Sequence, residues 1–195
     1  MIRYTNCRIC VRGSLVSACL IVDSAGYVSD VNNGFEDVDM HNAIVAPGFI
    51  EIQTNGLLGF HFTNFKNKEL YQSELSRVGK YLLSTGVVGF YPTLPTVAAS
   101  VFQQILPLLH KQEFSEAATI LGAHVEGPFL APARKGAHND KLLLTPSSSA
   151  AVDVYGEQNI NNIRIVTLAP EIEGSLPLIQ ELTQRNIRVS MGHSS

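Results

Sequence analysis

The residues best suited to chemistry lie in one short stretch, "TILGAHVEGPFLAPARKGAHND", at residues 119–140. Its first part reads as an apolar strand, and its second part as a polar loop rich in turn-forming residues. His124 and Glu126 lie on the same face of such a strand, because side chains alternate with a period of two. Burying a carboxylate costs free energy unless a cation or a metal ion compensates its charge. We therefore expect Glu126 to face a positive charge.

Polar side chains recur where the expected strands end: Gln53 and Asn55, His124 and Glu126, Glu171, and His193. In α/β folds, binding and catalytic groups gather at the carboxyl ends of parallel strands. Glu126 and His193 are of types that bind divalent metal ions, and their strands would lie roughly 10 Å apart. Their side chains can therefore meet at one ion. We expect His124 to be a hydrogen-bonding neighbour of this site rather than a ligand.

Each of these residues also has a purely structural interpretation. Glu126 could pair with a lysine or arginine, although its own strand carries no nearby cation. His193, taken alone, could be an ordinary hydrogen-bonded core histidine. His41, His61 and His110 fall in a linker, a loop and a helix end, and we interpret them as structural.

The wider pattern predicts an α/β fold. Residues 1–43 read as short strands joined by tight turns, the third of them "YVSDVNNG" at residues 27–34. From residue 44 to residue 195, near-continuous apolar strands alternate with amphipathic helices, which is typical of a parallel sheet built from βαβ units. Helices are expected over residues 66–86, 97–111 and 146–158, and in "SLPLIQELTQRN", where Ser175 is the expected N-cap.

Composition narrows the class of protein. The chain has 195 residues, 45% of them apolar and 16% charged, with a net charge of −3. These values are typical of a folded globular protein and do not favour nucleic acid or an anionic membrane as a partner. No stretch reads as a secretory signal or a membrane span, so we expect a cytoplasmic location. Cys7 and Cys10 form a C-x-x-C motif, which we interpret as two residues of a strand rather than a metal or redox pair.

Taken together, "APGFIEIQTNG", "LGAHVEGPFLAPARKGAHN", "VTLAPE" and "SMGHSS" resemble the N-acetylglucosamine-6-phosphate deacetylases of the amidohydrolase superfamily. The resemblance runs in order over nearly the whole chain. It implies a small β-sandwich portion at residues 1–43. It also implies an incomplete (β/α)8 TIM barrel of about five strands at residues 44–195. Ala131 stands where the family often has asparagine.

The resemblance also implies roles for individual residues. It places the metal-binding glutamate at Glu126, the first metal-binding histidine at His193, and a substrate contact at Ala137 and His138. Gln53 and Asn55 stand where dinuclear relatives hold a second metal, which implies a single divalent ion, zinc or iron. The family's second metal histidine, its phosphate contacts and its catalytic aspartate would all lie beyond Ser195.

The implied reaction is metal-dependent hydrolysis of N-acetylglucosamine 6-phosphate to glucosamine 6-phosphate and acetate, by an enzyme that is a homodimer in this family. We expect residues 1–195 alone to be inactive and poorly stable. Two alternatives stay open. One is another amidohydrolase, similar to dihydroorotases or deaminases, although these usually carry His-x-His where this chain has Gln53 and Asn55. The other is a truncated product without catalytic activity.

Overall fold

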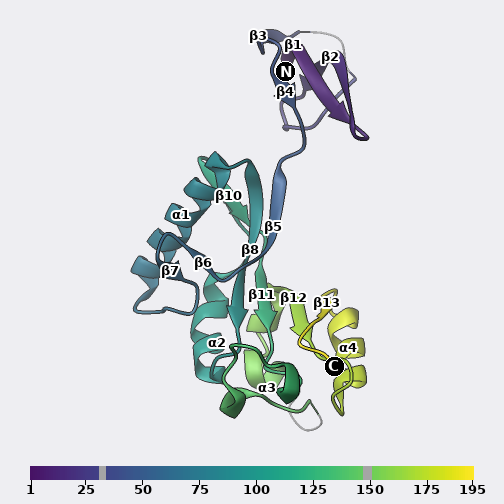
Figure 1. Cartoon of the computed structure of the whole chain (residues 1–195). Helices are drawn as coiled ribbons and strands as arrows, with labels where there is room; N and C mark the ends of the chain where they lie inside the picture. The colour runs from purple at the N-terminus through teal and green to yellow at the C-terminus, as the bar shows by residue number, and fades with distance from the viewer. Residues whose placement is uncertain (31–33, 147–150) are drawn as a thin grey trace. The chain divides into compact units, whose positions relative to one another are not determined.

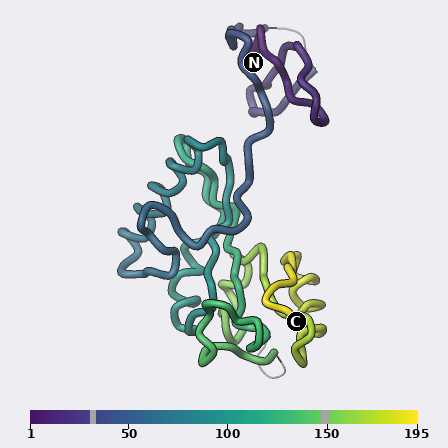
Figure 2. Tube along the Cα trace, viewed as in Figure 1, coloured from purple at the N-terminus to yellow at the C-terminus, as the bar shows by residue number. Residues whose placement is uncertain are grey.

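The chain folds into two compact units, Met1–Gly48 and Phe49–Ser195. A computed structural model describes residues 1–30, 34–146 and 151–195 (Figure 1). Figure 2 follows the same chain as a continuous trace. The expected boundary after residue 43 falls inside the first unit, because Ile44–Val45 forms strand β4 and pairs with β1 (Ile2–Val11).

The first unit is a small sheet centred on β1. Strand β2 (Ser14–Val22) pairs with β1 in antiparallel fashion, whereas β3 (Glu36–Asp39) and β4 pair with β1 in parallel. The expected third strand at residues 27–34 is wrong over its described residues, because only Val28 pairs there, in an isolated bridge to Val22. The physical reason is a turn held by Asp23, whose carboxylate accepts hydrogen bonds from two backbone N–H groups that follow it.

The second unit is built on a parallel sheet whose strands lie side by side in chain order. Its parallel strands are β5 (Phe49–Thr54), β8 (Val87–Pro95), β10 (Ala117–Ile120), β11 (Ala123–Glu126), β12 (Ile163–Leu168) and β13 (Arg188–Met191). β10 and β11 are successive parts of the third expected strand, and both pair with β8. β5 pairs with β8 alone and β13 with β12 alone, so the described strands do not close into a barrel. Short antiparallel strands flank the sheet: β6 (Gly56–Leu57) pairs with β7 (Phe60–His61), and β9 (Gln112–Phe114) pairs with β10.

Helices connect these strands where periodicity predicts them. They are α1 (Lys68–Ser84), α2 (Ala99–Ile105), α3 (Ala151–Tyr155) and α4 (Ser175–Gln184), with 3₁₀ turns at Leu106–Leu108, Pro132–Arg134, Asp140–Leu142 and Asn159–Asn162. Asn67 caps α1 by accepting a hydrogen bond from the backbone N–H of Leu70. Part of the segment before α3, residues 147–150, lies outside the described residues. None of the described helices is long and apolar enough to cross a bilayer.

The prediction that Ser175 caps α4 is wrong. The cap position is Gly174, and Ser175 is the first residue of the helix. Its buried hydroxyl donates instead to the carbonyl of Ala169, at 2.8 Å. Gly174 has φ +81°, a conformation that favours glycine, and so takes the cap position. The helix therefore begins at Ser175, one residue earlier than a serine cap predicts.

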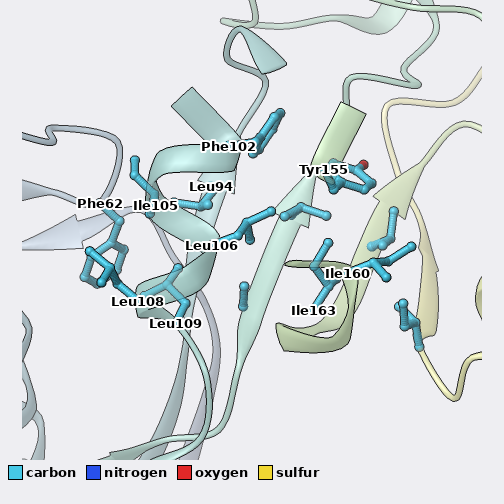
Figure 3. Close-up of a cluster of buried hydrophobic side chains, with 14 of the residues drawn as sticks. Phe62, Leu94, Phe102, Ile105, Leu106, Leu108, Leu109, Tyr155, Ile160 and Ile163 are labelled. Atoms are coloured by element: carbon cyan, nitrogen blue, oxygen red, sulfur yellow. The ribbon is translucent and has the colours of Figure 1, made fainter. Parts of the chain in front are cut away.

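A single apolar core supports the sheet (Figure 3). Phe102 of α2 packs against Tyr155 of α3, with ring centroids 5.3 Å apart in an edge-to-face arrangement. Leu94 of β8 and Val125 of β11 lie fully buried beside them in the same cluster. The strands that end at the predicted site are therefore held by packed, dehydrated side chains.

Candidate metal and ligand site

A pocket lies at the carboxyl ends of the parallel strands. Its volume is about 560 Å³, within the roughly 300–1,000 Å³ range that is common for small-molecule sites. The pocket is lined by Gln53, Asn55, His61, Pro95, Thr96, Glu126, Ala137, His138, Asn139 and His193. Among the site residues predicted from the sequence, all except His124 line it. The structure therefore gathers residues that lie as far apart in the chain as Gln53 and His193.

Glu126 is the last residue of β11, and its side chain is only 10% exposed. Thr96, which follows β8, places its hydroxyl oxygen 3.1 Å from the backbone carbonyl oxygen of Glu126. Gly127 comes next, with φ +80°, and a Cβ atom at this position would lie 2.2 Å from Thr96 Oγ1. The glycine is therefore required for Thr96 and Glu126 to approach each other.

His193 follows β13 and faces Glu126. Its Nδ1 lies 2.8 Å from the backbone carbonyl of Arg134, which can only accept, so Nδ1 carries a proton. In the neutral ring Nε2 then holds a lone pair, and this atom lies 2.8 Å from Glu126 Oε1. Two electron-rich atoms at this distance need a positive charge between them. A carboxylate oxygen and an imidazole nitrogen form a donor set that suits a divalent metal ion such as zinc.

The loop at residues 131–138 holds His193 in place. The Arg134 carbonyl of this loop accepts a hydrogen bond from His193 Nδ1. The Ala131 N–H of the same loop donates to the His193 carbonyl at 3.1 Å. Gly136 has φ +59°, and a Cβ there would lie 3.6 Å from the His193 ring. The polar loop after β11 therefore orients a side chain from a strand two positions away in the sheet.

His138 has the opposite hydrogen-bonding pattern to His193. Its Nδ1 accepts from the backbone N–H of Thr96 at 3.2 Å and lies 2.8 Å from the Thr96 hydroxyl. The proton of the neutral ring must then sit on Nε2, which lies 3.7 Å from Glu126 Oε1. Burial lowers the pKa of His138, which favours this neutral form. Glu126, His138 and His193 offer ligand atoms within 4.8 Å of one another, but the tautomer makes His138 a donor rather than a metal ligand.

His124 lies beside the pocket and is fully bonded. Its Nδ1 donates to the carbonyl of Ile52 at 2.9 Å, and its Nε2 lies 2.8 Å from the hydroxyl of Thr167. Burial lowers its pKa. These contacts give His124 the surroundings of a hydrogen-bonding neighbour, and it is absent from the group of potential metal ligands among the described residues.

Four residues that line the pocket were not predicted from the sequence, namely His61, Pro95, Thr96 and Asn139. Two of them make contacts that bear on the site, and one polar residue expected near a strand end, Glu171, lies outside the pocket. His61, interpreted above as structural, lines the pocket from β7, and Thr96 contacts both Glu126 and His138. A histidine in a short hairpin and a threonine after a strand carry no distinctive spacing, so no sequence signal separates them from ordinary residues. Glu171 is exposed and instead accepts hydrogen bonds from the Ser194 hydroxyl and the Ser195 N–H, each at 2.8 Å.

Comparisons with known proteins give curated relatives that are deacetylases of N-acetylated amino-sugar phosphates. The chain is 39% identical over 206 residues to an N-acetylglucosamine-6-phosphate deacetylase of Mus musculus, and 35% identical over 208 residues to one of Caenorhabditis elegans. Both matches cover 100% of this chain and 49% of the relative. The chain thus spans about half the length of these curated relatives. No family-level sequence profile matches it.

Solved structures agree with the sequence relatives. The crystal structure of the N-acetylglucosamine-6-phosphate deacetylase from Pasteurella multocida superposes with a TM-score of 0.73 at 25% identity. That match covers 99% of this chain and 51% of the other.

Proposed function

Because the chain belongs to the N-acetylglucosamine-6-phosphate deacetylase family, we propose that it forms the metal- and sugar-binding part of such an enzyme. The reaction is hydrolysis of the acetamido group of N-acetylglucosamine 6-phosphate, which gives glucosamine 6-phosphate and acetate. The observation that carries the proposal is the 2.8 Å approach of His193 Nε2 to Glu126 Oε1, between two residues that line the pocket.

Glu126 and His193 would hold one divalent ion, zinc or iron. When bound, such an ion supplies an activated water and polarises the carbonyl of the substrate. The remaining roles belong to the chain itself. His138 presents a neutral Nε2–H donor to a ligand oxygen, and Ala137 and Asn139 flank it on the pocket wall. Thr96 fixes that donor by occupying Nδ1.

General acid–base catalysis by a second carboxylate requires a group that the described pocket does not supply. Amide hydrolysis needs a proton delivered to the departing amine, a role that usually contributes about 10²–10⁴-fold to the rate. Glu126 is the only carboxylate among the described residues that line the pocket, and it already faces His193. We therefore expect residues 1–195 to bind metal and sugar without releasing acetate.

The same proposal extends to the architecture. Parallel strands that neighbour one another in chain order, from β5 to β13, are the arrangement of one arc of a (β/α)8 barrel. Exposed apolar side chains lie on the two outermost of them, including Phe49, Ile50 and Ile52 on β5 and Met191 on β13. Strands that cover these edges would complete the barrel. A cytoplasmic homodimer is the assembly that we expect for the complete enzyme.

Calorimetry and an acetate assay on residues 1–195 test the function together. N-acetylglucosamine 6-phosphate should bind when zinc is present, and no acetate should appear. Failure of the sugar phosphate to bind with zinc supplied would reject the proposed function. Tighter binding of dihydroorotate or of a purine base would instead favour another amidohydrolase activity. Acetate release that depends on zinc would show that the described pocket contains the acid–base group after all.

A further inference from the structure

We infer that His61 is a second hydrogen-bond donor to the sugar, acting beside His138 in the same pocket. The inference rests on the proposed function, which it extends by naming a residue that binds neutral oxygen atoms of the ligand. His61 belongs to β7 and lines the pocket together with Gln53 and Asn55.

The hydrogen bonds around His61 repeat those around His138. Its Nδ1 accepts from the backbone N–H of Thr63 at 3.2 Å and lies 2.7 Å from the Thr63 hydroxyl. For His138 and Thr96 the corresponding distances are 3.2 and 2.8 Å. In both rings a backbone N–H occupies the Nδ1 lone pair, so the proton of the neutral imidazole is on Nε2. The pocket thus has two histidines that a threonine fixes in the same tautomer.

The donor of His61 is available to a ligand. No described residue accepts a hydrogen bond from its Nε2, although its Nδ1 is fully occupied. The hydrogen bonds within the turn use only Nδ1, so the Nε2–H can donate to a ligand without breaking them. When a ligand fills the pocket, this half-buried Nε2–H loses the water molecule to which it donates. That loss costs free energy unless the ligand supplies an acceptor in place of the water.

The hairpin fixes His61 next to the end of β5. His61 pairs with Gly56, and the N–H of Phe62 donates to the carbonyl of Asn55 at 2.9 Å. A Cβ atom on Gly56 would lie 2.1 Å from the carbonyl oxygen of Phe60, so this close turn requires glycine. Asn55 and His61 are thereby tied to one another through the backbone.

The chemistry of this wall suits hydroxyl and carbonyl oxygens rather than phosphate. The side-chain amides of Gln53 and Asn55 make no hydrogen bond to any residue that the structure describes, and they line the pocket with His61. No lysine or arginine belongs to the described lining. Neutral donors without a cation recognise uncharged oxygen atoms well, whereas tight phosphate binding usually relies on charge-assisted hydrogen bonds.

Nitrogen NMR of the histidine rings tests the inference on the 195-residue chain. The six histidines, labelled with ¹⁵N, are assigned by single substitutions, and zinc is kept in excess. Before any ligand is added, His61 and His138 should show the Nε2–H tautomer, and His124 the Nδ1–H tautomer. N-acetylglucosamine and inorganic phosphate are then added in separate titrations. We expect the neutral sugar to move the resonances of both His61 and His138, while the exposed His41 and His110 stay in place as internal controls.

The outcomes separate this inference from the proposed function. A sugar-dependent shift of His138 without one of His61 would overturn the role of His61 and leave the function standing. No shift of either ring would overturn both. A shift of His61 with phosphate alone would contradict the recognition of neutral oxygens.

A matched pair of variants gives a second measurement. His61→Gln should weaken binding of N-acetylglucosamine by about 3- to 10-fold, as expected for the loss of one well-placed hydrogen bond. His110→Gln, on the exposed end of a turn, should leave the affinity unchanged. Equal affinity of the two variants would contradict a ligand contact at His61.

Discussion

Hydrogen bonds to Nδ1 divide the histidines of the pocket into two chemical types. A carbonyl acceptor at Nδ1 leaves Nε2 of His193 with a lone pair, as a metal ligand needs. A backbone N–H at Nδ1 leaves Nε2 of His138 and His61 with a proton, as a hydrogen-bond donor needs. The sequence could indicate that His193 and His138 matter, but their tautomers depend on backbone groups of Arg134 and Thr96 that only the folded chain brings near.

Gly127 provides a stability test at this scale. Gly127→Ala adds a Cβ that would lie 2.2 Å from Thr96 Oγ1, in a residue that also has φ +80°. We expect the free energy of unfolding to fall by about 1–3 kcal/mol, because the strained backbone and the overlap of the new Cβ with Thr96 both destabilise the folded state. Urea denaturation of the two chains measures it.

Gly59→Ala is the matched control, because Gly59 has φ +78° but no atom within 4 Å of its added Cβ. The difference between the two variants isolates the overlap with Thr96. Equal destabilisation by both substitutions would mean that the approach of Thr96 to Gly127 imposes no constraint.

Among the helices and strands, periodicity predicted the long helices and their alternation with strands, since both follow from local apolar patterns. Lys68–Ser84 forms a helix as expected, and α2 ends at Ile105, before Pro107. Features that depend on single polar contacts were not predictable. The hairpin β6–β7, which places His61 in the pocket, spans too few residues to show any period.

Tyr155 tests how α3 supports the site. Its hydroxyl, fully buried, donates to the carbonyl of Gly127 at 2.9 Å and so ties α3 to the residue that follows Glu126. Tyr155→Phe should lower the free energy of unfolding by about 1–3 kcal/mol, because it leaves a buried carbonyl without its donor. Thermal and urea unfolding measure the loss. Tyr81→Phe serves as the control, because Tyr81 is 46% exposed and its substitution should change the free energy of unfolding little. An equally small change for Tyr155→Phe would show that the hydrogen bond of Tyr155 does not support the site.

At the scale of the whole molecule, the potential ligands all belong to the unit Phe49–Ser195. The C-x-x-C motif belongs to the other unit, where Cys7 is buried and its thiol donates to the carbonyl of Ala18 at 3.0 Å. Among the described residues, no group of potential metal ligands contains a cysteine. This placement agrees with the interpretation of Cys7 and Cys10 as residues of a strand.

Changing Cys7 and Cys10 together to serine should therefore leave the zinc content of the chain unchanged. Elemental analysis after dialysis is the measurement, and circular dichroism confirms that the variant is folded. Loss of zinc from a folded double variant would revive a metal site at the C-x-x-C motif.

Zinc binding by Glu126 variants tests directly whether Glu126 and His193 hold a metal ion. Residues 1–195 equilibrated with zinc should bind about one ion per chain, held by Glu126 and His193 with water in the remaining positions. Glu126→Gln keeps the size of the side chain but removes its negative charge, so zinc binding should fall sharply. Glu171→Gln makes the same change at an exposed residue in the turn after β12, outside the pocket, and should bind zinc as the unchanged chain does. Zinc bound equally well by the Glu126→Gln variant would contradict the account.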